Sequence, residues 1–206
     1  MLEARDLAAL RGDRRLFSGL DFAVEAGDLL QVAGHNGSGK TTLLRMLAGL
    51  IVPEQGMILW QGQPLRTQRE DYARDLFYFG HLPGLKDEFN GVENLRFASE
   101  LAGTLVTAGE AAGALARFGL EGFEDLPAKV LSQGQKRRVA LARLLLSEAR
   151  LWVLDEPFTA LDVSAIDVLR AILQQHLVRG GMLVMTSHQD VAVTHSGRVK
   201  QLRLGR

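Results

Sequence analysis

The stretch GHNGSGKT, residues 34–41, matches the pattern G-x-x-x-x-G-K-[ST] in full. It follows the apolar run Leu29–Ala33 and precedes Thr42–Leu50, so a strand, a tight loop and a helix are expected in that order. The glycines let successive backbone N–H groups turn toward an anion, and the helix start adds partial positive charge. A plain glycine-rich turn is the alternative, but the flanking strand and helix disfavour it. The predicted triphosphate cradle comprises Gly34, His35, Asn36, Gly37, Ser38, Gly39, Lys40, Thr41 and Thr42.

Length and composition restrict the class of protein. The chain has 206 residues, 24 Lys and Arg against 24 Asp and Glu, and no cysteine. This length accommodates one domain with a full core and a small subdomain. Balanced charge argues against a surface built to coat nucleic acid, and the lack of cysteine excludes disulfides and cysteine-bound metals. The charged N-terminus lacks the apolar run of a secretory signal, and no stretch is long enough to predict a transmembrane helix.

Apolar runs bounded by Gly, Pro or Asp alternate with longer helical segments. The runs are Leu29–Ala33, Met57–Trp60, Leu76–Phe79, Leu151–Leu154 and Met182–Thr186. This alternation predicts a mainly parallel sheet covered by helices on both faces. Residues 1–30 and 56–66 instead favour short strands joined by turns, which indicates an antiparallel layer. Residues 85–131 are predicted to be all helical, because Asn90 and Thr107 are each followed three residues later by Glu and then by an apolar helix.

Two adjacent carboxylates follow the apolar run Leu151–Leu154. The carboxyl end of a parallel strand lies at the same edge of the sheet as the phosphate loop. Asp155 is therefore suited to hold Mg²⁺ through water, and Glu156 to accept a proton from a water attacking the γ-phosphorus. A solvated strand end would account for an isolated Asp-Glu pair, but the upstream cradle favours the catalytic interpretation. His188 follows the run Met182–Thr186 and is expected at the same edge. A lone histidine is more often structural, but this position favours a hydrogen bond to the γ-phosphate or a role in positioning the Glu156 region.

The segment Leu131–Gln135 is followed by three cations, Lys136, Arg137 and Arg138. Ser132 and Gln135 have capping-box spacing, and a helix cap alone would explain both. It does not explain three cations expected in the first turn, where they would oppose the helix dipole. A phosphate at this helix start would relieve the conflict. The residues predicted to contact that phosphate are Ser132, Gly134 and Gln135.

Together these segments resemble the ATP-binding cassette (ABC) ATPases over nearly the whole chain. Gly34–Thr41 is similar to the Walker A loop, Leu151–Glu156 to Walker B, and Leu131–Gln135 to the LSGGQ signature. Ala160–Asp162 is similar to the D-loop and His188 to the switch histidine. The resemblance implies an α/β fold: a P-loop NTPase (RecA-like) core with a short antiparallel β layer and an α-helical subdomain at about residues 85–131, forming one nucleotide-binding domain over residues 1–206.

The resemblance also implies a mechanism. ATP and Mg²⁺ would bind, and the catalytic residues would be Glu156 as general base, Lys40 and His188. Two copies would pair head to tail, with the signature of one copy covering the nucleotide held by the other. A membrane-transporter subunit would be the partner.

Three positions depart from the family pattern. Arg11 stands where an aromatic residue usually stacks on adenine; a guanidinium can stack on a base, and Phe17 is an alternative. His81 replaces the usual glutamine and joins Thr41 and Asp155 as an expected metal ligand. Gln133 stands where glycine is usual, which leaves Gly134 to approach the phosphate.

Further segments resemble the ATPase subunits of cytochrome c maturation systems, which are associated with haem export or haem-chaperone release. They are Leu59–Gln63, Gly80–Lys86, Glu93–Phe97 and the segment from Gly180 to Asp190. The resemblance implies an integral-membrane partner similar to CcmB, contacting residues 80–130 at the cytoplasmic face of the inner membrane, and further haem-handling subunits. The alternatives are the ATPase subunit of another ABC transporter, a soluble ABC protein acting on nucleic acid or ribosomes, and a module that binds ATP without hydrolysing it.

Overall fold

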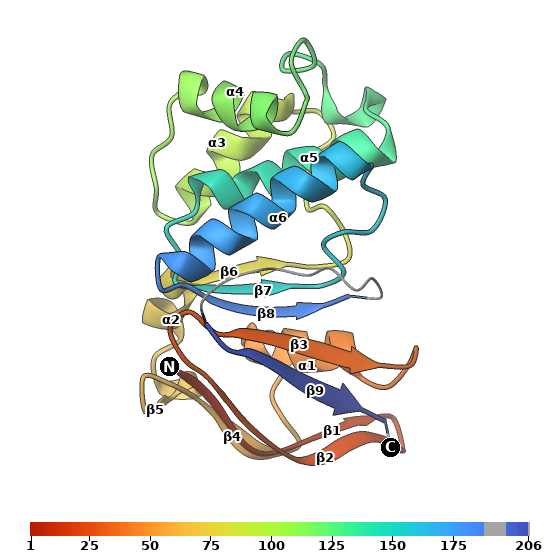
Figure 1. Ribbon diagram of the computed structural model, residues 1–206, viewed down its shortest axis with the longest axis vertical. Coiled ribbons are helices and arrows are strands. Elements are labelled where there is room, and N and C mark those ends of the chain that lie inside the picture. The colour runs from red at the N-terminus through yellow and green to blue at the C-terminus, as the bar shows by residue number, and fades with distance from the viewer. Residues whose placement is uncertain (188–196, 206) are drawn as a thin grey trace. The chain divides into compact units, whose positions relative to one another are not determined.

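The computed structural model describes residues 1–187 and 197–205 (Figure 1). The chain divides into two compact units. The core unit comprises Met1–Tyr78, Ala149–Pro157 and Gln174–Arg206. The helical unit comprises Phe79–Glu148 and Phe158–Leu173.

The first sheet of the core unit is antiparallel, with strand order β2-β1-β4-β5. The strands are β1 (Leu2–Arg11), β2 (Arg14–Val24), β4 (Gln55–Trp60) and β5 (Gln63–Pro64). The antiparallel layer is confirmed, but the expected short strands are wrong for β1 and β2, which run for 10 and 11 residues. The two strands stay paired over this length because register shifts between Ala4 and Leu7 and between Leu7 and Leu10 accommodate irregular positions.

The second sheet has strand order β6-β7-β8-β3-β9. Its strands are β6 (Leu76–Phe79), β7 (Leu151–Leu154), β8 (Met182–Thr186), β3 (Leu29–Gly34) and β9 (Val199–Leu204). β3 pairs in parallel with β8 and β9, and β7 in parallel with β8, which confirms parallel pairing among these strands. β9 was not predicted.

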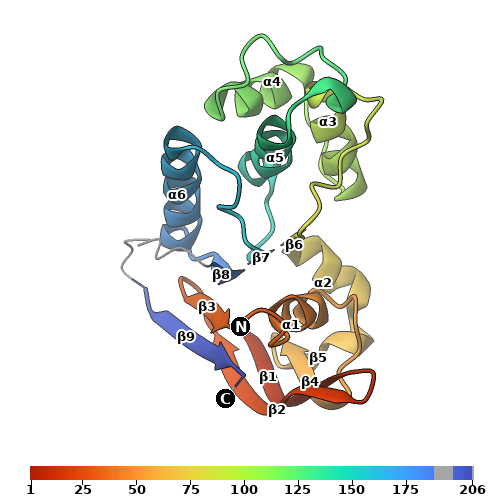
Figure 2. The ribbon, with the colours of Figure 1, turned by 90° about the vertical axis from the view of Figure 1, so that its right-hand side faces the viewer.

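The core of this unit surrounds α1 (Lys40–Leu47), which lies between the two sheets (Figure 2). Short helical segments η1 (Leu65–Thr67) and α2 (Arg69–Asp75) follow β5. Fully buried side chains include Leu2, Leu7, Leu43, Leu47 and Trp60. Each such side chain contributes about 1.5–3 kcal/mol by leaving water, and their packing fixes where the ends of β3 and β7 lie.

The helical unit contains α3 (Gly91–Leu101), α4 (Ala108–Arg117), α5 (Gln133–Ala142) and the first part of α6 (Val163–Val178). Two short 3₁₀ segments, η2 (Ala128–Val130) and η3 (Arg143–Leu146), flank α5. The predicted capping boxes that open α3 and α4 are confirmed at Asn90 and Thr107. Among the described helices, none is long and apolar enough to cross a membrane.

Candidate nucleotide-binding site

The loop between β3 and α1 has room only for glycine at two positions. A Cβ on Gly34 would lie 2.5 Å from Ser38 Oγ and 2.7 Å from the Leu204 carbonyl. Gly39 has φ 99° and caps α1, and a Cβ there would meet Phe17 at 3.1 Å. Because Gly39 is the N-cap, α1 begins at Lys40, two residues earlier than predicted. The first N–H groups of α1 therefore face the loop.

The loop offers groups suited to an anion. The ammonium group of Lys40 donates to the Gly34 carbonyl at 2.7 Å and lies 3.4 Å from the His35 carbonyl, so it is folded over the loop. The hydroxyl of Ser38 is buried and has no hydrogen-bond partner in the described part of the chain. An orphaned buried hydroxyl, a nearby ammonium and a helix N-terminus fit the phosphates of a nucleotide.

A chain of hydrogen bonds ties this helix start to β7 and β8. The hydroxyl of Thr41 donates to Asp155 Oδ2 at 2.8 Å, and the hydroxyl of Thr186 donates to Asp155 Oδ1 at 2.8 Å. Asp155 is only 2% exposed, so both carboxylate oxygens accept these hydrogen bonds in a position that is almost inaccessible to solvent. Thr41 and Asp155 thus lie side by side, as hard oxygen ligands for Mg²⁺ would have to.

Glu156 occupies a constrained backbone position next to this carboxylate. Its φ is 51°, in the left-handed region that costs a non-glycine residue about 1–3 kcal/mol. Its N–H donates to Thr186 Oγ1 at 2.8 Å, which holds the turn in place. The position of the Glu156 side chain is therefore set by a locked backbone at the end of β7, and its carboxylate is partly buried.

Thr186 is a site residue that the sequence analysis missed. Its hydroxyl bridges Asp155 and Glu156 and is fully buried. The sequence offered one signal, namely that the apolar run Met182–Thr186 ends in a polar residue. Because β8 lies beside β7 in a parallel sheet, the last residue of β8 is placed next to the carboxylates that follow β7.

The signature segment forms a capped helix start in the helical unit. Ser132 is the N-cap of α5: its hydroxyl oxygen accepts from the Gln135 N–H at 3.2 Å, and its own N–H donates to Gln135 Oε1 at 2.9 Å. This confirms the predicted capping box. Ser132 is exposed, and its hydroxyl proton is not used by the cap, so it is free to donate to a ligand oxygen.

The prediction that three cations crowd the first turn of α5 is wrong. Lys136 is the fourth residue of the helix, and Arg137 and Arg138 follow it. Each has a partner in the helical unit, which removes the conflict with the helix dipole. Lys136 pairs with Asp87 at 3.1 Å, Arg137 lies over the ring of Phe79 at 5.0 Å, and Arg138 pairs with Asp162.

Asp162 joins this network at the start of α6. Hydrogen bonds from the Ala165 N–H and the Ser164 hydroxyl lower the pKa of Asp162, and the charge of Arg138 lowers it further. The ionised Asp162 therefore links the beginning of α6 to α5 within the helical unit.

Comparison with known proteins identifies the family. The family model described as ABC transporter matches residues 17–159. The chain belongs to the ABC transporter family of ATP-binding proteins.

Relatives and solved structures agree with this membership. A protein of Dechloromonas aromatica named "Cytochrome c biogenesis ATP-binding export protein CcmA" is 55% identical over 205 residues, covering 100% of both chains. A protein of Escherichia coli K12 with the same name is 48% identical and covers 99% of this chain and 96% of its own. A putative ABC transporter ATP-binding protein from Pyrococcus furiosus is 28% identical with a TM-score of 0.84, covering 98% of this chain and 96% of that one. The cassette MJ0796, solved as a dimer bound to ADP and phosphate, has a TM-score of 0.84 at 21% identity and covers 100% and 97%. These likenesses confirm the predicted ABC-type α/β fold.

The remaining predicted site residues lie as follows. Arg11 is exposed at the end of β1, opposite Arg14 in the hairpin, whereas Phe17 is buried beneath the Walker A loop and presents no free face to a base. His81 is exposed and belongs to the helical unit. His188 lies outside the described residues. Across residues 1–187 and 197–205, no group of three or more His, Asp or Glu side chains could hold a metal ion.

Proposed function

We propose that this chain is the ATPase subunit of an ABC export complex in cytochrome c biogenesis, serving haem export or the release of a haem chaperone. The observation that carries ATP hydrolysis is the hydrogen-bonded series Thr41, Asp155, Thr186 and Glu156 beside the Walker A loop. The export assignment is supported by the names of the two CcmA relatives, which align with nearly all of this chain. Both units together would form one nucleotide-binding domain over residues 1–206.

The Walker A loop would hold the phosphates of ATP. Its backbone N–H groups and Ser38 would face the phosphate oxygens, and Lys40 would move from the Gly34 carbonyl to the β- and γ-phosphates. Arg11 is the exposed side chain assigned to the base. Mg²⁺ fits Thr41 Oγ1 directly and Asp155 through water, and when bound it would balance charge on the phosphate oxygens. His81 is proposed as a further ligand of Mg²⁺.

Glu156 would act as the general base. Its backbone is held at the carboxyl end of β7, the edge of the sheet where the γ-phosphate would lie, and from there its carboxylate would take the proton of an attacking water. Lys40 would stabilise the developing negative charge, and His188 would donate a hydrogen bond to the same phosphoryl group.

A second copy would complete the site. The free hydroxyl proton of Ser132 and the first N–H groups of α5 suit the γ-phosphate held by the other copy's Walker A loop. The contacts assigned to this helix start are Ser132, Gly134 and Gln135. Binding of ATP would close the dimer, and hydrolysis would reopen it.

The partner would be an integral-membrane subunit similar to CcmB, with other haem-handling subunits, at the cytoplasmic face of the inner membrane. A cavity of about 340 Å³ in the helical unit supports this docking site. It is lined by Phe89, Glu93, Arg96, Phe97, Glu100, Leu105 and Val106. Leu105 is 89% exposed there, so its apolar side chain is available for burial under a partner.

Mixing two inactive variants tests the ATPase site that two copies share. Lys40→Ala removes the Walker A cation and Ser132→Arg blocks the signature helix, so each homodimer is expected to lose most of its ATPase activity. A head-to-tail heterodimer of the two has one intact site, so the mixture is expected to recover a substantial fraction of wild-type turnover. No recovery from mixed, folded proteins would contradict the shared site.

A further inference from the structure

A second cavity, of about 250 Å³, lies in the core unit. Its walls come from the end of α1, the loop that follows it, β4 and the segment from Pro64 to Arg69. The wall side chains are mainly apolar and include Met46, Ile51, Pro53, Ile58 and Leu65. None of the residues assigned to the nucleotide site lines this cavity.

Two arginines are the charged residues of its lining. Arg66 and Arg69 are exposed, and neither guanidinium has an ion pair or hydrogen bond in the part of the chain that the structure describes. Each guanidinium carries several N–H donors in a fork that matches a carboxylate or a phosphate. An apolar chamber with two unpaired guanidinium groups is complementary to a molecule with an apolar body and an anionic head.

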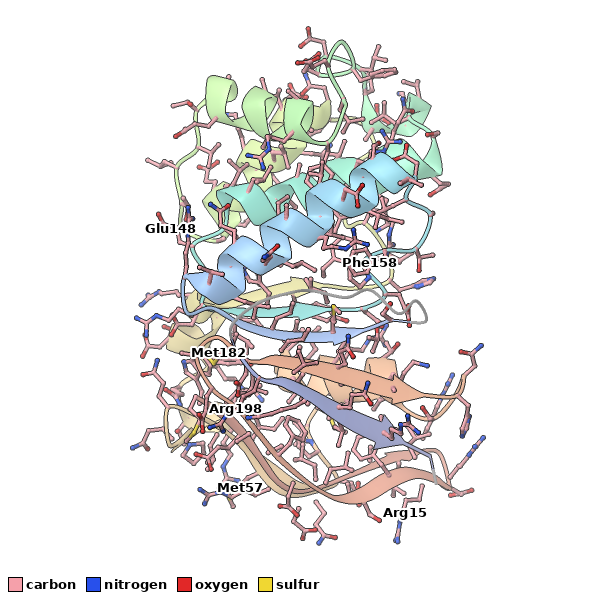
Figure 3. The ribbon with its side chains drawn as sticks, viewed as in Figure 1. Arg15, Met57, Glu148, Phe158, Met182 and Arg198 are labelled. Atoms are coloured by element: carbon pink, nitrogen blue, oxygen red, sulfur yellow. The ribbon has the colours of Figure 1, made fainter. Side chains whose placement is uncertain are left out.

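The surroundings favour access from solvent. Met57 on β4 is 49% exposed and Val52 is 73% exposed, so apolar surface continues from the cavity to the outside (Met57 is labelled in Figure 3). The volume is below the range of about 300–1,000 Å³ typical of sites for drug-sized ligands, which suits a single narrow chain.

We propose that this cavity binds an amphiphile with one apolar chain inserted among Met46, Ile58 and Leu65 and an anionic headgroup held by Arg66 and Arg69. A free fatty acid and an anionic membrane phospholipid both carry this chemistry. The proposal is independent of the function proposed above, because it uses none of the residues that bind nucleotide.

Titration with dodecanoate below its micelle concentration, followed by calorimetry on the full chain, tests the free source. Saturable binding is expected, with Arg66→Glu/Arg69→Glu raising the Kd at least tenfold. Met57→Glu is expected to act similarly, because it adds a carboxylate to the lining of the same cavity. Arg179→Glu is the matched control: Arg179 is an exposed arginine of the same unit, outside the cavity, and its replacement should leave the Kd unchanged.

Flotation with vesicles tests the membrane source. Binding to phosphatidylglycerol vesicles but not phosphatidylcholine vesicles, lost in Arg66→Glu/Arg69→Glu and kept in Arg179→Glu, would assign the headgroup to a lipid. Binding of dodecanoate alone would assign it to a free acid. Failure of both probes, or binding equally weakened by Arg179→Glu, would overturn the proposal. ATP hydrolysis by the isolated chain is expected to be unchanged in the cavity variants, which separates this test from that of the nucleotide site.

Discussion

At the scale of single residues, the arrangement around Asp155 explains why adjacent carboxylates can have different roles. Asp155 is buried and accepts hydrogen bonds from two hydroxyl groups, which fix its carboxylate in place. Glu156 follows in a left-handed backbone conformation that turns it out of the strand direction. Thr186 connects the two through one hydroxyl group.

Replacement of Glu156 by Gln is expected to keep ATP binding and to abolish most hydrolysis. The amide keeps the size of the side chain but cannot accept the proton of the attacking water, so a loss of about 10²–10⁴-fold in kcat is expected. Steady-state phosphate release together with an ATP-binding titration checks this. Unchanged turnover in the variant would exclude Glu156 as the general base.

Replacement of Thr186 by Val tests the bridging hydroxyl. Val keeps the branched shape but removes the donor to Asp155 and the acceptor for the Glu156 N–H, so the free energy of unfolding should fall by about 1–3 kcal/mol. Turnover should fall as well, because Glu156 loses its anchor. Thr186→Ser restores the hydroxyl and should recover most of the turnover; a Ser variant as slow as Val would show that shape, and not hydrogen bonding, is what matters.

At the scale of elements, three helices begin with the same capping box but differ in what they are proposed to do. The caps are Asn90 for α3, Thr107 for α4 and Ser132 for α5. Each satisfies backbone N–H groups at its helix start. Only the α5 cap is assigned a nucleotide contact, so the three allow stability and function to be separated.

Ser132→Ala and Thr107→Ala form a matched pair. Each loses a helix cap and should lower the free energy of unfolding by about 1 kcal/mol. Ser132→Ala should also reduce ATP turnover strongly, whereas Thr107→Ala should leave it close to wild type. Denaturant unfolding and ATPase assays on both variants check this, and an equal loss of turnover in the two would reduce Ser132 to a helix cap.

The C-terminal end of α6 contains a partly buried histidine. The His176 ring stacks on Trp152 at 3.7 Å between centroids, and a Cβ on Gly181 would lie 2.3 Å from it. Burial lowers the pKa of His176 from 6.5 to about 4. The neutral form is therefore the one that fits the fold.

This histidine predicts a pH-dependent stability. Because the pKa of His176 is lower in the folded state, its contribution is complete above pH 6.5 and is lost as the pH falls toward 4. The full difference is worth about 3 kcal/mol in the free energy of unfolding. Urea unfolding between pH 7 and 4 should show a smaller loss in His176→Phe than in wild type; an identical loss would place the titration elsewhere.

Several strands could be predicted from the sequence, and the strand that was not predicted was missed for a physical reason. β6, β7 and β8 match their predicted runs because each is a short, mainly apolar stretch between polar residues or glycines. β9 alternates apolar and polar residues and was not predicted. It pairs with β3 at an edge of the sheet, and the ammonium group of Lys200 donates to buried Asp28 at 2.6 Å, 172 residues away in the sequence. Partners this distant in the sequence are brought together only by the tertiary fold, so a local sequence pattern does not reveal them.

The site also combines residues that follow a local sequence pattern with residues that only the tertiary fold brings together. The Walker A loop follows a local pattern, so its glycines and Lys40 could be identified directly. Thr186 and the partners of Lys136 and Arg138 could not, because they come from distant segments that the sheet and helices bring together.

At the scale of the whole molecule, the proposed function requires two further surfaces. One is the dimer face that brings Ser132 of one copy to the Walker A loop of another. The other is the cavity beside Leu105, which a membrane subunit would cover.

Leu105→Asp tests the second surface. A carboxylate at this exposed apolar position should prevent co-purification with a CcmB-like subunit from detergent-solubilised membranes, while ATPase activity of the isolated chain stays unchanged. Val178→Asp is the control, because Val178 is 65% exposed on α6 and does not line the cavity. Equal recovery of the membrane subunit with both variants would place the docking surface elsewhere.

The most direct measurement is a crystal structure of Glu156→Gln grown with Mg²⁺ and ATP. If two copies share the ATPase site, the crystal should contain a head-to-tail pair in which Ser132 Oγ of each copy lies within hydrogen-bond distance of the γ-phosphate held by the other copy's Walker A loop. A structure in which Ser132 faces solvent, or packs inside its own subunit far from both γ-phosphates, would exclude a shared site.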